Sequence, residues 1–291
     1  MDFQWFFAHH KRLMYIPLVL LAFSLLFLGV HYAQTGDLIY KDVTLQGGLS
    51  VTINTPAEVP DLERQLGQAL GTPVVVRRLA EFGTGTQLGF LIEASEVTEA
   101  QIKAPLESLL GIPITEENYS IEQTGPTLGQ SFYKEMVRAL FFSFLLMAIV
   151  VFVAFRSLMP SATIVFIAFS DIVITLAAIN LLGMRISTAG IAALLLLIGY
   201  SVDTDVLLTT RLLKRDEGEI RHRFIEAMKT GLMMTSTTLA AVTVGYLVST
   251  SPVLQQMFLI IFIGLIVDIL TTYLLNGSVL LRYMERKRSS A

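Results

Sequence analysis

Residues 191–208 read IAALLLLIGYSVDTDVLL, an apolar run that is long enough to cross a bilayer yet carries two aspartates. Asp171 and Asp268 lie in two other apolar runs of the chain. An ionised carboxylate at the centre of a membrane helix costs about 2.5–3.5 kcal/mol on insertion scales, so four would oppose insertion by about 10–14 kcal/mol. Protonation, pairing or a polar interior would remove this cost. The pattern predicts a membrane protein that moves ions or is driven by them.

Composition indicates the same class of protein. The chain is 53% hydrophobic and has a mean hydropathy of +0.64, which is well above an ordinary soluble domain. It contains no cysteine, which excludes disulfides and thiolate metal sites. Six segments are long enough to span a hydrocarbon core about 30 Å thick. We predict spans at 13–32, 137–156, 160–182, 187–210, 230–250 and 254–282.

The distribution of basic residues predicts the orientation of these spans. If both termini are cytoplasmic, the inside segments hold most of the Lys and Arg residues that flank the spans, and the two short outer connections hold only Arg185. We therefore predict three parts: a cytoplasmic N-terminus with the first transmembrane helix (1–32), an external domain (33–136), and a five-helix transmembrane bundle (137–291) with a cytoplasmic loop at 211–229 and a cytoplasmic C-terminus.

The external segment has the pattern of a small α+β domain. The order of its predicted elements is β-α-β-β-α-β, the ferredoxin-like split unit. The strands are predicted at 43–53, 74–76, 88–92 and 119–123, the helices at 60–70 and 98–110, and a turn at 83–85. The segment has no histidine and no cluster of catalytic or metal-ligating side chains. We expect a recognition or structural module rather than an enzyme, with no cofactor and no metal.

Polar residues follow defined faces of the fourth predicted span. Ser201, Asp205 and Thr209 recur at i, i+4 and i+8 and form one stripe. Asp203 lies about 200° around the helix from Asp205. Neither face suits contact with lipid, so we expect protein or water around the inner half of this helix. The other candidate supporting residues are Thr204, Thr237, Thr238 and Lys229.

Each candidate also has a purely structural interpretation. Asp171 and Asp268 lie on threonine-bearing faces, where Asp–Thr hydrogen bonds can simply tie helices together. A functional interpretation is favoured for Asp203 and Asp205. The structural alternative, capping of the cytoplasmic end of the helix, is a poor explanation because an aspartate near a helix C-terminus opposes the macrodipole. Lys229 fits a positive-inside anchor and, alternatively, a partner for a carboxylate.

Six motifs, in order along the chain, resemble those of the SecF branch of the SecD/SecF family, part of the RND export superfamily. They are Asp42-Val-Thr-Leu-Gln-Gly-Gly48, Thr124-Gly-Pro-Thr-Leu-Gly129, Phe155-Arg156, Asp171-Ile-Val-Ile-Thr175, Ile198-Gly-Tyr-Ser-Val-Asp-Thr-Asp205 and Thr235-Ser-Thr-Thr-Leu239. The resemblance implies an RND-type half that assists protein translocation across the cytoplasmic (cell) membrane and uses ion-motive force. The implied partners are a SecD-like membrane subunit, the Sec translocation channel, the translocating polypeptide and membrane lipid.

The chain departs from the bacterial pattern in its fourth-span signature. The family usually reads Asn-Asp-Thr where this chain reads Asp203-Thr204-Asp205, so the family's acid position falls on Thr204. Asp203 instead matches the pattern of SecD, and the differences favour the archaeal branch. On this basis Asp203 is predicted to be the main ion carrier, with Asp205 as the nearest alternative. Asp171 and Asp268 are predicted to act mainly through stability.

Two other functions remain open at this stage. One is an RND-type exporter of small molecules or lipids, although about 100 external residues are few for the substrate pocket that such exporters build. The other is a structural subunit of the translocase that is not coupled to ions. Nucleic-acid binding is not expected, because the basic stretch at 211–223 contains no aromatic residue.

Overall fold

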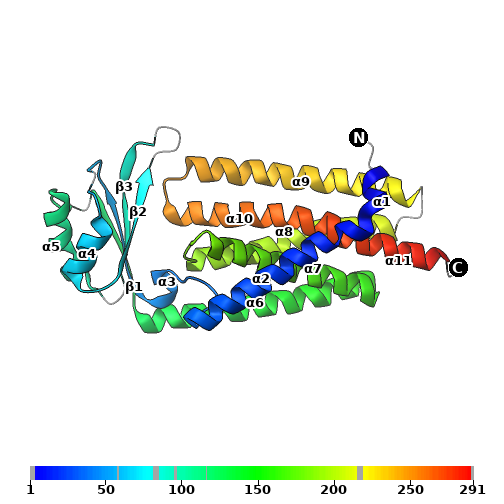
Figure 1. Cartoon of the computed structure of the whole chain (residues 1–291), viewed down its shortest axis with the longest axis horizontal. Helices are drawn as coiled ribbons and strands as arrows, with labels where there is room; N and C mark the ends of the chain where they lie inside the picture. Colours follow the sequence, from blue (N-terminus) through cyan, green and yellow to red (C-terminus); the bar gives the residue numbers. More distant parts are fainter. Residues whose placement is uncertain are drawn as a thin grey trace. The chain divides into compact units, whose positions relative to one another are not determined.

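The computed structural model describes residues 4–57, 59–80, 85–94, 97–115, 117–214 and 219–289. It divides into two compact units (Figure 1). One, the membrane unit, consists of residues 1–40, 138–184 and 189–291. The other, the sheet domain, consists of residues 41–137 together with residues 185–188. The sheet domain therefore includes the connection between two helices of the membrane unit.

The membrane unit consists of long apolar helices. In the described part of the chain, six helical stretches are long and apolar enough to cross a membrane, which is the number that the sequence predicts. The helices are α1 (Gln4–Leu13), α2 (Tyr15–Thr35), α6 (Pro126–Phe155), α7 (Leu158–Leu181), α8 (Thr188–Leu213), α9 (Ile220–Val248), α10 (Pro252–Leu270), η1 (Thr271–Asn276) and α11 (Gly277–Ser289). Two helices begin about ten residues before the predicted spans: α6 at Pro126, because proline suits the first turn, and α9 at Ile220.

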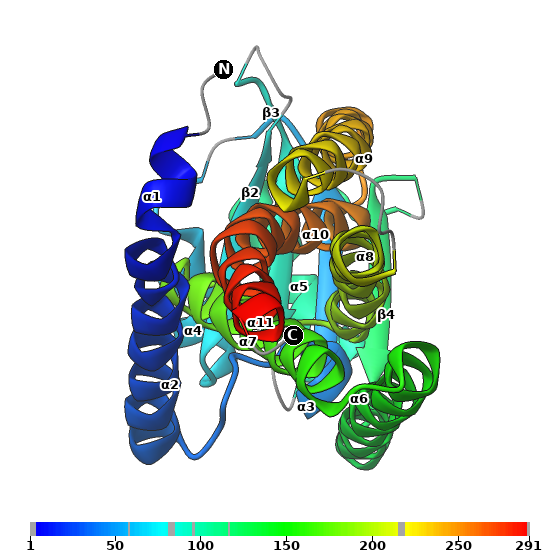
Figure 2. The same cartoon turned by 90° about the vertical axis from the view of Figure 1, so that its right-hand side faces the viewer.

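Burial is uneven among these helices. In α7, 61% of the most apolar window is buried, and in α6 only 6%. Helix α10 contacts both α7 and α9, and α2 contacts α7. In the view of Figure 2, α7 and α10 lie inside the bundle while α2 and α6 lie at its edges. Most of the surface of α6 within the membrane is thus left for lipid or for another protein.

In the described residues, the sheet domain is a four-stranded antiparallel sheet with two longer helices, α4 and α5, and one short helix, α3. Its elements are α3 (Val43–Gln46), β1 (Gly48–Asn54), α4 (Leu62–Leu70), β2 (Val74–Ala80), β3 (Gln87–Ala94), α5 (Glu99–Leu110) and β4 (Tyr119–Thr124). The strand order is β2-β3-β1-β4. Alternate residues of the strands, such as Val51 and Ile92, form one core with Leu66 of α4 and Ile102 of α5. Both helices therefore cover the same face of the sheet (Figure 1).

The first predicted strand is wrong at its beginning. Residues 43–46 form the short helix α3 rather than a strand, because the Asp42 side chain accepts a hydrogen bond from the Val43 N–H and caps it. Gly47, with φ of 87°, then redirects the chain into β1. The turn predicted at 83–85 falls mostly outside the described residues, which stop at 80 and resume at 85.

Two glycine motifs of the sequence meet in the sheet domain. A Cβ atom added to Gly47 would lie 2.4 Å from the Pro126 Cα. A Cβ atom added to Gly129 would lie 2.7 Å from the Gly47 nitrogen. Both distances are far below normal contact, so only glycine lets the end of α3 lie against the beginning of α6.

Candidate functional site

Three of the four intramembrane aspartates converge inside the membrane unit. Asp171 of α7, Asp205 of α8 and Asp268 of α10 are 1%, 0% and 1% exposed. They come from three different helices, so their position depends on the packing of the bundle rather than on one helix face. Among the described residues, none of the three makes an ion pair with Lys, Arg or His.

Hydroxyl groups satisfy Asp171 from two sides. Ser201 of α8 donates to one carboxylate oxygen, and Thr271 of η1 donates to the other. A hydrogen bond from a hydroxyl group to an ionised carboxylate is stronger than one to a neutral acceptor, and more so in an interior that excludes water. Asp171 thus joins α7 to α8 and to the last span.

One threonine connects the other two carboxylates. The Thr272 Oγ1 lies 3.0 Å from Asp205 Oδ1 and 3.2 Å from Asp268 Oδ1. Thr204 Oγ1 donates to Asp268 Oδ2 at 3.0 Å, and Asn276 Nδ2 donates to Asp205 Oδ1 at 2.7 Å. We call these residues the aspartate network: Asp171, Asp205 and Asp268 with Ser201, Thr204, Thr271, Thr272 and Asn276.

The network has unused hydrogen-bonding capacity. Asp205 Oδ2 is buried without a hydrogen-bond partner, as are Thr209 Oγ1 and Asn276 Oδ1. An ionised carboxylate only accepts hydrogen bonds, whereas a protonated one can also donate. Among the described groups, Asp205 Oδ2 therefore has neither a donor nor an acceptor within hydrogen-bond distance. Within the described part of the chain, no group of three His, Cys, Asp or Glu residues is placed to hold a metal ion.

A π-helical turn in the last span supplies three members of the network. Residues 271–276 form η1 between α10 and α11, and Thr271, Thr272 and Asn276 all lie on it. Such turns are rare, and within α-helices they occur frequently at functional sites. Side chains of other helices pack closely against two glycines of the neighbouring turns. A Cβ atom added to Gly264 would lie 2.2 Å from Leu197, and one added to Gly277 would lie 2.7 Å from Phe224.

The predicted candidates separate into two groups. Asp171, Asp205, Asp268, Ser201 and Thr204 are brought together, and Thr209 is buried on the same helix as Asp205. Asp203, around which we expect protein or water, is exposed on the surface of α8, because its face of the helix does not meet the rest of the bundle. Its predicted role as the carrier stays a prediction.

The supporting residues predicted on α9 are not members of the aspartate network. Thr237 and Thr238 both donate to the Met234 carbonyl, at 2.7 and 3.2 Å, and Lys229 is exposed. Sequence reasoning did not select Asn276. The feature of the sequence that could have identified Asn276 is that it is a polar amide among the apolar residues of the last span.

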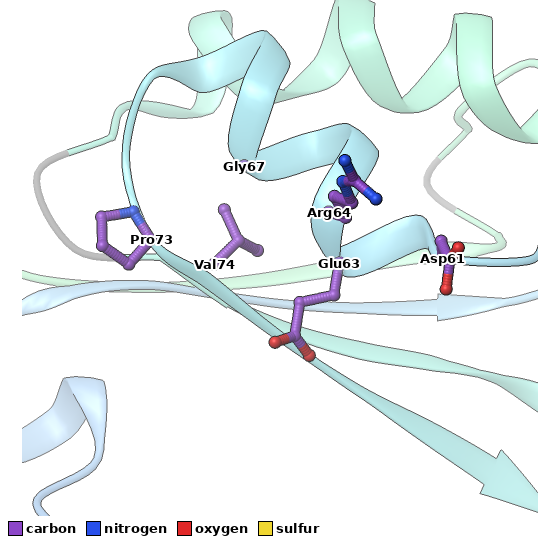
Figure 3. Close-up of a pocket in the computed structure, with 6 residues that line it drawn as sticks. All are labelled: Asp61, Glu63, Arg64, Gly67, Pro73 and Val74. Atoms are coloured by element: carbon purple, nitrogen blue, oxygen red, sulfur yellow. The ribbon is translucent and has the colours of Figure 1, made fainter.

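The sheet domain carries an open hollow between α4 and the beginning of β2. It is lined by Asp61, Glu63, Arg64, Gly67, Pro73 and Val74. In Figure 3 the charged ends of the acidic and basic side chains point away from one another. This arrangement lacks the convergent polar groups of a catalytic or cofactor site.

Comparison with known proteins agrees with this architecture. The SecD/SecF C-terminal family of protein export membrane proteins matches residues 108–286. SecF of Methanolacinia petrolearia is 37% identical over 95% of this chain and 94% of its own length. SecF of Thermococcus gammatolerans is 34% identical over 94% of this chain and 85% of its own length.

A solved structure shares the fold. The crystal structure of SecDF from Thermus, described as a translocon-associated membrane protein, superposes with a TM-score of 0.77 over 96% of this chain at 20% identity. This chain covers only 38% of that longer protein. With the family match over more than half of the chain and relatives of this similarity along nearly all of it, the chain belongs to the SecD/SecF family of protein-export membrane proteins, in its SecF branch.

Proposed function

We propose that this protein is the SecF subunit of a SecD/SecF complex that assists protein translocation across the cytoplasmic membrane and is coupled to ion-motive force through the aspartate network. The names of its relatives support the export role. The observation that carries the coupling is the convergence of three buried carboxylates from α7, α8 and α10 without a cationic partner among the described residues.

The electrostatics of the network favour proton or cation exchange. Burying an isolated ionised carboxylate is very costly, and three together repel one another as well. The network therefore has to carry protons or a bound cation for most of its lifetime. Thr272 has one hydroxyl proton for two carboxylates, so a change in the charge of Asp205 or Asp268 redirects that hydrogen bond. Replacing Asp205 by Asn, which keeps the shape and removes the titrating group, is the direct test of this step.

The sheet domain is proposed to be a ferredoxin-like module for recognition or support. The element order β-α-β-β-α-β and the sheet order β2-β3-β1-β4 support this assignment. We propose no catalytic activity, cofactor or nucleic-acid partner for it. The proposed partners of the whole protein, besides a SecD-like subunit, are the translocating polypeptide, the Sec translocation channel and membrane lipid.

A SecD-like subunit is expected to cover the surfaces that the six spans leave open. Only 6% of the most apolar window of α6 is buried. Asp203 is exposed on α8, and an acidic side chain is costly in contact with lipid. Gentle extraction from native membranes should therefore yield this chain together with a second membrane protein of the SecD type. Recovery of the chain at its own mass, with lipid alone, would contradict the proposal and favour an unpartnered exporter.

The topology follows from the positive-inside bias and predicts both termini in the cytoplasm. Cysteines can be introduced at Gln123 of β4 and at His222 near the beginning of α9, both exposed, into this cysteine-free chain. An impermeant thiol reagent added to intact cells should label the cysteine at position 123 and should reach the one at position 222 only after lysis. Labelling of both from outside would show that the orientation is wrong.

Two alternatives make different predictions. An RND-type exporter of small molecules or lipids would retain activity without a Sec channel. A structural subunit that is not coupled to ions would support export equally well with and without an ion gradient. The buried network favours the coupled subunit, because helix packing alone does not need three acids that lack a cation.

A further inference from the structure

The hydrogen-bond pattern of the sheet shows which backbone groups lie on its two edges. The strand order β2-β3-β1-β4 places β2 at one edge and β4 at the other. The Asn54 N–H, at the end of β1, donates to the Asn118 carbonyl at 2.9 Å. In an antiparallel ladder such bonded pairs alternate with non-bonded pairs, so Ser120 and Glu122 of β4 also direct their backbone groups toward β1.

The residues between them direct their backbone groups out of the sheet. A second bond confirms this alternation, because the Thr55 N–H donates to the Leu88 carbonyl of β3 at 3.0 Å. Odd-numbered residues of β1 therefore bond to β3 and even-numbered residues bond to β4. Within the described part of the chain, no group is hydrogen-bonded to the outward N–H and C=O groups of β4. We call these groups the β4 edge; they belong to Tyr119, Ile121 and Gln123.

The opposite edge of the sheet is closed. The same alternation makes the backbone groups of Val74, Val76 and Arg78 the outward groups of β2. The Val76 N–H, at the centre of this edge, donates to Glu63 Oε2 of α4 at 3.3 Å. Charged side chains and prolines are common devices that keep a sheet edge from pairing with another chain. Strand β2 carries two arginines and follows Pro73, whereas residues 119–124 contain no proline, lysine or arginine.

The surroundings of the β4 edge are acidic. Residues 111–124 contain three glutamates and no basic residue. Glu117 and Glu122 are both exposed. On a strand added beside β4, a basic side chain opposite Glu122 would form a favourable cross-strand pair, and an acidic one would be repelled. Charge complementarity therefore selects an extended chain that carries lysine or arginine.

We propose that the β4 edge docks an extended, basic segment of the translocating polypeptide, which adds to the sheet as a further strand. The identity of this occupant rests on the proposed function. Strand addition recognises main-chain groups, so it suits a substrate whose sequence varies. Three outward residues offer only a few hydrogen bonds, each of small net benefit, so the segment can also be released.

Binding of defined peptides to the full chain tests this proposal. The chain is held in nanodiscs of zwitterionic lipid, and empty nanodiscs give the background. The first probe is a fluorescent peptide of alternating threonine and lysine. The second is the same peptide with alternate amides N-methylated, which keeps its charge but removes main-chain donors. In the third, glutamate replaces lysine. Fluorescence anisotropy should show that the first binds at least about tenfold more tightly than the other two.

Two proline variants locate the site. Gln123→Pro removes an outward N–H of β4 without touching the bonds to β1, and proline is tolerated at such edge positions. It should weaken binding of the lysine peptide at least about threefold, whereas Gln123→Ala, which keeps the N–H, should bind like the native chain. Arg78→Pro makes the same change on β2 and should leave the affinity unchanged. An equal loss in Arg78→Pro would reject the β4 edge as the site.

Hydrogen exchange of the native chain gives an answer that does not depend on any variant folding. Added lysine peptide should protect the amides of Tyr119, Ile121 and Gln123, while those of Ser120 and Glu122, already bonded to β1, should change little. The proposal would be overturned by protection confined to β2, by equal binding of the N-methylated peptide, or by a β4 edge already protected by another subunit in the complex from native membranes. Binding to the purified chain needs neither an ion gradient nor a Sec channel, so its failure would reject the docking edge and leave the proposed coupling untouched.

Discussion

Asp205→Asn is expected to reduce protein export to the rate measured when the ion gradient has been dissipated, while the chain still inserts and binds its membrane partner. Asp205 is fully buried and its Oδ1 accepts from Thr272 and Asn276, so an amide oxygen can retain both hydrogen bonds. What the variant loses is the group that can gain and release a proton at Oδ2. Export by membrane vesicles, measured with and without an imposed gradient, gives the two rates.

Asp203→Asn is the matched comparison, two residues away on the same helix but exposed. The structure leads us to expect a smaller loss in this variant than in Asp205→Asn, which reverses the order that the sequence suggests. A larger loss in Asp203→Asn would restore the sequence-based order and place the carrier at the partner-facing surface. Gradient-dependent export that is unchanged in the double variant would leave the structural subunit as the better interpretation.

The cost of burying charge explains why the sequence could predict that the acids matter. Six apolar runs and four aspartates within them are properties of composition, and the described residues contain six helices that are long and apolar enough to cross a membrane. Composition does not show which face of α8 packs against the other helices. Ser201 and Asp205 lie on one face and Asp203 on another, and only the packing of α7, α8 and α10 shows that the first face is covered.

The π-helical turn explains why Asn276 was missed. An analysis based on 3.6 residues per turn assumes regular hydrogen bonding, whereas residues 271–276 are wound more widely. The error at α3 has a similar local origin. Residues 43–46 have a strand-like composition, yet capping by Asp42 and the conformation of Gly47 override that propensity.

Gly47→Ala is expected to destabilise the sheet domain by about 2–6 kcal/mol. The φ of 87° and ψ of 148° lie in a region that is almost reserved for glycine, where another residue costs about 1–3 kcal/mol. The added methyl group would also lie 2.4 Å from the backbone of Pro126, and overpacking of this kind costs about 1–3 kcal/mol. Slowly exchanging amides of β1 and β3 in the full chain measure the free energy of unfolding of this domain.

Gly71→Ala separates the two contributions. Gly71 also has a positive φ, of 68°, but an added Cβ atom would meet no atom within 4 Å. This variant should lose only about 1–2 kcal/mol, the cost of a left-handed conformation. If Gly47→Ala loses more stability than Gly71→Ala, the difference reports how tightly the end of α3 is packed against the first turn of α6. Gly47 and Gly129, which meet there, come from two motifs that are distant in the sequence. A loss in Gly47→Ala within the conformational cost of about 1–3 kcal/mol would show that the contact with Pro126 is easily relieved.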